Sequence, residues 1–168
     1  MADTTNVFEF AMKMEKDGQE FYEDQASRTD NPALKKIWQQ LAQDEIKHYQ
    51  IFKRLRDGEI KEAAAMANLG TAILNTSKTV FEQLPREDFK FGQDVFAAWE
   101  KAKDLEIKTE AFYRQKSSEA TEDEVRQSFT LLADEEHKHV TLIEHVLDFL
   151  HQPKSWLDDA EWSNLTQA

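Results

Sequence analysis

The sequence contains no cysteine. This absence excludes structural disulfides and every thiolate-ligated centre, including iron–sulfur clusters and cysteine-type zinc sites. Any metal that this chain binds must therefore be held by carboxylates and imidazoles.

Glycine and proline are also scarce, with only four and three copies in 168 residues. Such a composition favours helices and lacks the frequent turns of sheet proteins. The length fits one domain, large enough to bury about two-thirds of the surface that the unfolded chain would expose. We therefore expect a single all-α domain over residues 1–168.

Long apolar runs and basic clusters are missing as well. No stretch approaches the roughly 18 apolar residues of a membrane-spanning helix, and the N-terminus lacks the pattern of a signal peptide. Acidic residues outnumber basic ones 33 to 21, and the formal net charge of −12 repels nucleic-acid phosphates and anionic lipids. We expect a cytoplasmic protein that binds neither nucleic acid nor a membrane.

The most informative feature that is present is an internal repeat. The segment LAQDEIKH at 41–48 matches LADEEHKH at 132–139, an offset of 91 residues. Two further pairs of positions are aligned by the same offset: Glu15 with Glu106, and Tyr22 with Tyr113. Each half of the chain is therefore predicted to form one copy of a helical hairpin.

The first hairpin is predicted over about 4–57, because apolar residues recur there with a helical period. Asn31 can cap the second helix of this hairpin, and Pro32 suits its first position. The Asp57–Gly58 pair should end that helix. The result is a helix, a turn and a second helix.

The second hairpin is predicted over about 93–151, with its second helix opening at Thr121, where Glu124 completes a capping box. The crossover at about 58–92 should be partly helical, since a structureless loop of that length is unusual in a compact domain. The tail at 152–168 is expected to form a short helix. Together these elements predict a four-helix bundle of two hairpins.

Each half carries a Glu-x-x-His pair, Glu45 with His48 and Glu136 with His139. Such residues lie one turn apart on one helix face. A single pair of this kind is usually solvated, but this one occurs twice and is flanked by apolar residues both times. Burying an unpaired carboxylate costs several kcal/mol, and no lysine or arginine shares the face. A divalent metal would supply the missing positive charge.

One more glutamate in each hairpin lies at the matching height. Glu15 and Glu45 are each 15 residues from position 30, which places both at ~22 Å from the turn. The neighbouring acids Glu20 and Glu110 are rejected because their partners in the repeat are not acidic. The predicted metal ligands are therefore Glu15, Glu45, His48, Glu106, Glu136 and His139. Four carboxylates balance two divalent ions, and this ligand chemistry suits iron, with manganese or zinc as alternatives.

Two tyrosines follow the outer glutamates by two helical turns: Tyr22 follows Glu15 and Tyr113 follows Glu106. Each phenol is predicted to hydrogen-bond to a ligand carboxylate of the opposite hairpin. Each is equally suited to be a core aromatic residue, and the two interpretations are compatible. Trp38 is interpreted as core packing, as is Trp99.

These segments resemble the rubrerythrin family of ferritin-like proteins over nearly the whole chain. The resemblance rests on residues 14–22 and 41–48 and on their counterparts ending at Tyr113 and His139. It implies a ferritin-like bundle with a di-iron site that reacts with hydrogen peroxide or dioxygen. It also implies a homodimer or a larger homo-oligomer.

The sequence departs from the family pattern in two places. Typical members add a four-cysteine rubredoxin module, which is absent from these residues, so a separate electron-donor protein is expected. They also carry a further glutamate one turn after Glu106, where this chain has Thr109. The substitution takes away the basis for the ligand exchange with His48 that the family associates with efficient peroxide reduction, and it predicts a more symmetric site.

Three functions follow from these features. The first is a di-iron oxidoreductase that reduces hydrogen peroxide, or dioxygen, with electrons from an external donor. The second is a ferroxidase or iron-handling protein that uses the same ligands. The third is a metal-free helical interaction module, for which the acidic residues would be mere surface.

Overall fold

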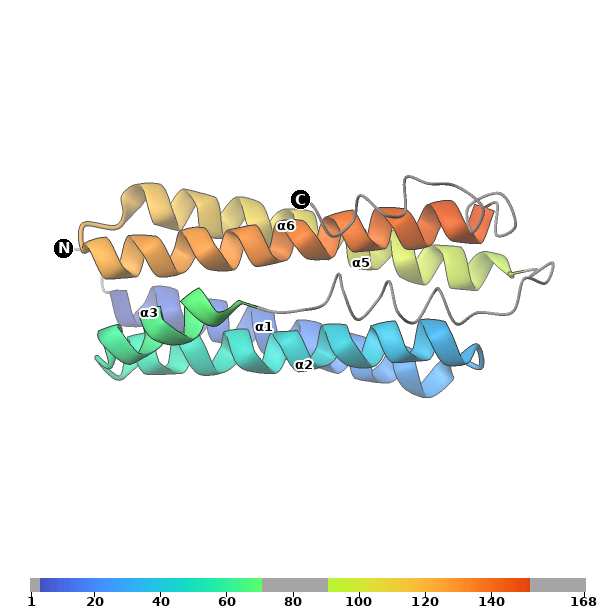
Figure 1. Cartoon of the computed structure of the whole chain (residues 1–168), viewed down its shortest axis with the longest axis horizontal. Coiled ribbons are helices and arrows are strands. Elements are labelled where there is room, and N and C mark those ends of the chain that lie inside the picture. The colour runs from blue at the N-terminus through green and yellow to red at the C-terminus, as the bar shows by residue number, and fades with distance from the viewer. Residues whose placement is uncertain (1–3, 71–90, 152–168) are drawn as a thin grey trace.

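The computed structural model describes residues 4–70 and 91–151 (Figure 1). Within these residues the chain forms five helices and no strand, which confirms the all-α prediction. The helices are α1 (Thr4–Arg28), α2 (Pro32–Arg56), α3 (Ile60–Leu69), α5 (Gln93–Glu119) and α6 (Asp123–His151). The helix predicted in the tail and the second half of the crossover lie outside the described residues.

The four long helices form two layers, with α1 and α2 in one and α5 and α6 in the other (Figure 1). Each layer is an antiparallel hairpin, as the repeat predicted. Helix α3 begins the crossover and packs against both α2 and α6. The bundle is therefore ferritin-like, with its interior between the two hairpins.

The turn between α1 and α2 forms through local side-chain chemistry. The Oδ1 atom of Asn31 accepts hydrogen bonds from the backbone N–H groups of Ala33 at 3.0 Å and Leu34 at 3.1 Å. This confirms the predicted N-cap. At the other end α2 stops at Arg56, and Gly58 adopts the positive φ of 82° that reverses the chain.

The predicted N-cap of α6 is wrong by one residue. The helix begins at Asp123, so its N-cap is Glu122 rather than Thr121, and the carbonyl of Glu122 accepts the first intrahelical bond from the N–H of Arg126 at 2.9 Å. This register places Asp123 and Glu124 in the first turn, where the helix dipole favours negative charge.

Two hydrophobic clusters fill the bundle interior. The tryptophan cluster lies toward the turn between α1 and α2, and its largest members are Tyr22, Trp38 and Trp99. The phenylalanine cluster lies toward the opposite end, and its largest members are Phe52, Tyr113 and Phe129. Both tryptophans are 1% exposed, which confirms that they belong to the core.

None of the helices in residues 4–70 and 91–151 combines the length and apolar character needed to cross a membrane.

Candidate metal centre

The six predicted ligands lie together in the bundle interior, between the two hydrophobic clusters. All of them are buried, with Glu45 the most accessible at 4%. Helices α1 and α5 each contribute one glutamate, and α2 and α6 each contribute a Glu-x-x-His pair. Four helices thus bring the residues to one level of the bundle, because the two halves of the repeat share the same register.

The ligand atoms form two overlapping groups, and within each group they lie within 4.8 Å of one another. The first group is Glu15, Glu45, His48 and Glu136, and the second is Glu45, Glu106, Glu136 and His139. Glu45 and Glu136 belong to both groups. This is the arrangement expected of two neighbouring cation positions that share two bridging carboxylates.

Both imidazoles direct Nδ1 toward the carboxylates. The Nδ1 atom of His48 lies 3.0 Å from Glu136 and 3.5 Å from Glu15. The Nδ1 atom of His139 lies 3.2 Å from Glu106 and 3.3 Å from Glu136. The two rings are nearly parallel, with centroids 5.8 Å apart. One nitrogen of each ring is thus placed to bind a cation in its own group.

Every glutamate of the cluster has one carboxylate oxygen without a hydrogen-bond partner among the described residues. These atoms are Glu15 Oε2, Glu45 Oε1, Glu106 Oε2 and Glu136 Oε2. A buried, unpaired carboxylate oxygen is costly, so native structures almost always satisfy it. Four such oxygens beside two imidazole nitrogens fit two divalent cations in both charge and ligand type.

The pKa values of the cluster residues also indicate that it requires added positive charge. Burial, followed by repulsion from neighbouring carboxylates, raises the pKa of Glu45 and Glu136 well above the ordinary value. Burial opposes charge on the imidazoles, but adjacent carboxylates outweigh it and raise the pKa of His48 and His139 well above the usual range. Without a metal, bound protons therefore supply the positive charge that divalent ions would bring.

Each tyrosine joins the cluster from the opposite hairpin. The hydroxyl of Tyr22 on α1 donates to Glu106 on α5, and the hydroxyl of Tyr113 on α5 donates to Glu15 on α1. Burial, followed by the charge of the accepting glutamate, raises the pKa of both phenols well above the usual value, which keeps them protonated as donors. The phenols thereby orient the two carboxylates that belong to only one cation group each.

A family model described as Rubrerythrin matches residues 6–147. The chain belongs to the rubrerythrin family. The match spans all four long helices and includes the whole cluster, so a two-metal site is compatible with both the family and the geometry. No curated protein and no solved structure matches the chain.

The rubrerythrin-family cluster includes an acid that the sequence reasoning missed. Asp44 is fully buried, and its Oδ2 atom lies 3.0 Å from Nε2 of His139. A carboxylate on the second imidazole nitrogen fixes the ring orientation and strengthens the ring as a ligand. The sequence spacing could have identified Asp44 as buried. It belongs to a series on one face of α2 in which successive members are four and then three residues apart: Ile37, Leu41, Asp44, His48 and Ile51.

The repeat is not symmetric at this position. The counterpart of Asp44 is Glu135, which is buried and pairs with Lys138 on its own helix at 3.3 Å. Nε2 of His48 has no hydrogen-bond partner among the described residues. His139 is therefore the more firmly held of the two imidazoles.

We predict that Asp44→Asn weakens metal binding in the group that contains His139. The substitution keeps the side-chain size but removes the charge that polarises the imidazole, and such changes lower affinity by about 10- to 100-fold. Competitive titration against a metal-binding dye measures the two affinities separately. Asp134→Asn on α6 is the control, because Asp134 pairs with Arg114 at the protein surface. Equal losses in both variants would contradict the assigned role.

The rejected residues lie away from the cluster. Glu20 is exposed on α1, and Glu110 pairs with Arg114 at 3.1 Å on the outside of α5. The hydroxyl of Thr109 donates to the carbonyl of Leu105 in its own helix at 2.8 Å. At the position where typical family members carry a further glutamate, this chain thus makes only an intrahelical bond.

Proposed function

We propose that this rubrerythrin-family chain is a di-iron carboxylate oxidoreductase that reduces hydrogen peroxide, or dioxygen, with electrons from an external donor. One observation carries the proposal. Four buried glutamates each have one oxygen without a hydrogen-bond partner among the described residues, and they form two groups of ligand atoms that share two of those glutamates. Two divalent cations would give these oxygens partners and balance the four carboxylates.

Each residue has a distinct role in this proposal. Glu15 and His48 would hold one ion, Glu106 and His139 would hold the other, and Glu45 and Glu136 would bridge the two. Oxygen and imidazole ligands suit iron, manganese or zinc. We propose iron because zinc does not change its oxidation state and because membership of the rubrerythrin family favours a di-iron site.

The chemistry balances with two ferrous ions. When bound, they would supply the two electrons that, with two protons, convert one hydrogen peroxide molecule into two water molecules. The protein holds the carboxylates in place through Tyr22 and Tyr113. The hydrophobic clusters on either side limit water access and side reactions at the centre.

The test is anaerobic reconstitution with ferrous iron, followed by hydrogen peroxide with an excess of reductant. We expect peroxide to be consumed over many cycles while the iron content of each chain stays constant. Glu15→Gln should lose most of this activity because it removes one ligand. Glu20→Gln, on the exposed face of the same helix, is the matched control and should retain it.

Other outcomes separate the competing functions. A single round of oxidation followed by growing iron content would favour a ferroxidase or iron-handling role over peroxide reduction. Failure to bind iron would overturn both functions, and failure to bind manganese and zinc as well would leave a metal-free interaction module. Identical activity of Glu15→Gln and the wild type would also contradict the site.

A further inference from the structure

The two halves of the internal repeat differ at two aligned core positions, where one half of the bundle interior has tryptophans and the other has phenylalanines. The 91-residue offset aligns Trp38 with Phe129, and it aligns Phe8 with Trp99. The tryptophan cluster therefore carries two indoles where the phenylalanine cluster carries two phenyl rings. Phenyl rings already fill the equivalent space, so packing alone does not require tryptophan.

The indole pair also has a closer geometry than its counterpart. The rings of Trp38 and Trp99 stack with centroids 3.6 Å apart and an interplanar angle of 17°. The rings of Phe8 and Phe129 are 6.0 Å apart at 20°. Two indoles in direct contact share a positive charge, which makes the pair easier to oxidise than a single indole.

The indole pair is connected to the metal centre. The ring of Tyr22 lies against that of Trp38, with centroids 5.6 Å apart and an interplanar angle of 29°. The hydroxyl of Tyr22 donates to Glu106, a proposed iron ligand. Four groups in contact thus lead outward from the centre: Glu106, Tyr22, Trp38 and Trp99.

The other half of the repeat has an equivalent tyrosine beside a ligand glutamate, but that tyrosine contacts a phenylalanine instead of a tryptophan. Tyr113 donates to Glu15, and its ring lies 6.0 Å from that of Phe129. A phenyl ring resists oxidation at potentials that oxidise a phenol or an indole. Among residues 4–70 and 91–151, only the half that contains Trp38 and Trp99 therefore offers a continuous series of oxidisable side chains in contact with the cluster.

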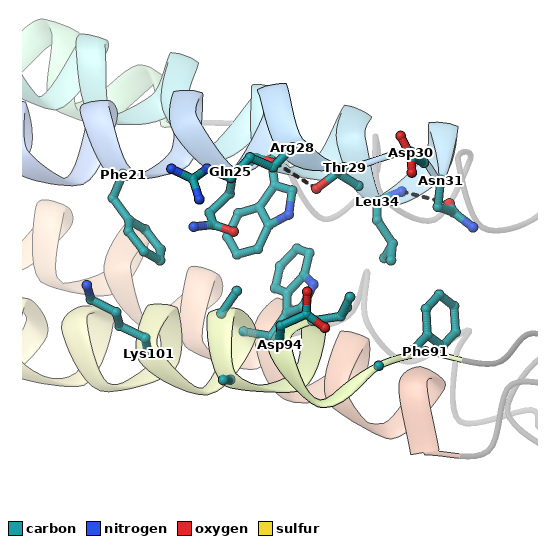
Figure 2. Close-up of a pocket in the computed structure, with 16 residues that line it drawn as sticks. Phe21, Gln25, Arg28, Thr29, Asp30, Asn31, Leu34, Phe91, Asp94 and Lys101 are labelled. Carbon is teal, nitrogen blue, oxygen red and sulfur yellow. Dashed lines mark hydrogen bonds between the residues drawn. The ribbon is translucent and has the colours of Figure 1, made fainter.

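The outer end of this series reaches a hollow between the α1–α2 turn and the start of α5 (Figure 2). The hollow has a volume of about 710 Å³, and both indoles form part of its wall. Across it Lys101 extends toward Phe21, with Nζ 5.0 Å from the ring centroid (Figure 2). A small reductant in the hollow would therefore lie beside the indole pair.

We propose that Tyr22 and the stacked indoles of Trp38 and Trp99 form an electron relay between the hollow and the metal centre. This inference rests on the proposed function. A ferric centre does not oxidise a phenol, so only a centre that a second peroxide molecule has oxidised by two further electrons could draw an electron from Tyr22. The relay assigns to the tryptophans a role beyond core packing.

The relay moves one electron at a time and no net proton. Tyr22 would give one electron to a centre that peroxide has oxidised beyond the ferric state, while its phenolic proton would pass to Oε1 of Glu106. The indole pair then gives an electron to the tyrosyl radical, and the proton returns from Glu106 to the phenol oxygen. Finally, a one-electron reductant of the reduced-flavin class gives an electron to the oxidised indole pair. The reductant is oxidised by one electron, and the centre is reduced by one.

The test is rapid freezing of iron-loaded protein after mixing with several equivalents of peroxide per iron pair, without reductant, followed by electron paramagnetic resonance. We expect a radical signal that narrows when the protein is grown with deuterated tryptophan. Absorption of the iron, recorded on the same mixture, reports separately whether peroxide has oxidised the centre.

Three variants assign the signal. Trp38→Phe/Trp99→Phe copies the pair already present in the other half of the chain and is expected to lose the tryptophan signal. Tyr22→Phe should lose it as well, because the connection to Glu106 is cut. Tyr113→Phe removes the equivalent hydrogen bond from the other half and should keep the signal. Helix content and iron loading are measured for each.

The outcomes separate the relay from the proposed function. If the iron is oxidised but no tryptophan radical forms, or if Tyr22→Phe and Tyr113→Phe behave alike, the relay is wrong and peroxide reduction stands. If peroxide does not oxidise the iron of the wild type, both are wrong.

Discussion

Replacing both bridging glutamates, as Glu45→Ala/Glu136→Ala, is expected to abolish binding of both metal ions. Each group of ligand atoms contains both residues, so the double variant leaves one carboxylate and one imidazole for each ion. Two ligands are too few to hold a divalent ion of this kind tightly. Elemental analysis after anaerobic reconstitution with ferrous iron should give about two ions per chain for the wild type and none for the variant.

The control is Glu20→Ala/Glu110→Ala, which removes the two rival acids on α1 and α5. Glu20 is exposed and Glu110 pairs with Arg114, so this variant should bind metal like the wild type. Retention of both ions by the variant that lacks Glu45 and Glu136 would show that the bridging assignment is wrong.

Removal of the metal is expected to lower the thermal unfolding midpoint of the wild type substantially. At a free-metal concentration about 1,000 times the dissociation constant, each ion stabilises the folded state by about 4 kcal/mol. For a chain of this size, that corresponds to about 8–16 °C for each ion. Differential scanning calorimetry with and without a chelator measures the shift.

The Glu45→Ala/Glu136→Ala variant separates the metal effect from any other action of the chelator. Its unfolding midpoint should be the same in both conditions, because it has no ion to lose. An equal shift in the variant and the wild type, or no shift in either, would contradict stabilisation through this cluster.

The position of the cluster could be predicted because the repeat supplies two copies of the same arrangement. Each Glu-x-x-His pair taken alone is ambiguous, but the offset identifies Glu15 and Glu106 as the further acids and excludes Glu20. The structure brings these residues within reach of one another. The repeat thus predicts contacts between helices, which helical periodicity alone does not.

Asp44 was missed because it precedes Glu45 directly, and adjacent helical positions differ by about 100° in direction. On a wide buried face both positions point inward, one toward the cations and the other toward His139. The alternation by four and three residues along α2 would have identified it.

The contact between Trp38 and Trp99 could not be predicted from either hairpin alone. The two residues belong to α2 and α5, in different layers, so their distance depends on how the hairpins pack. The N-cap of α6 was mispredicted by one residue, because the helical period fixes which face is buried but not the residue at which a helix begins. The separate donor protein, the homo-oligomer and the cytoplasmic location stay predictions.

The most direct test of the two-metal centre is anomalous X-ray diffraction from crystals of the iron-loaded protein, recorded on both sides of the iron absorption edge. We expect two anomalous peaks between the helix layers, one beside Glu15 and His48 and the other beside Glu106 and His139. A single peak, or iron found only at the protein surface, would contradict the two-metal centre.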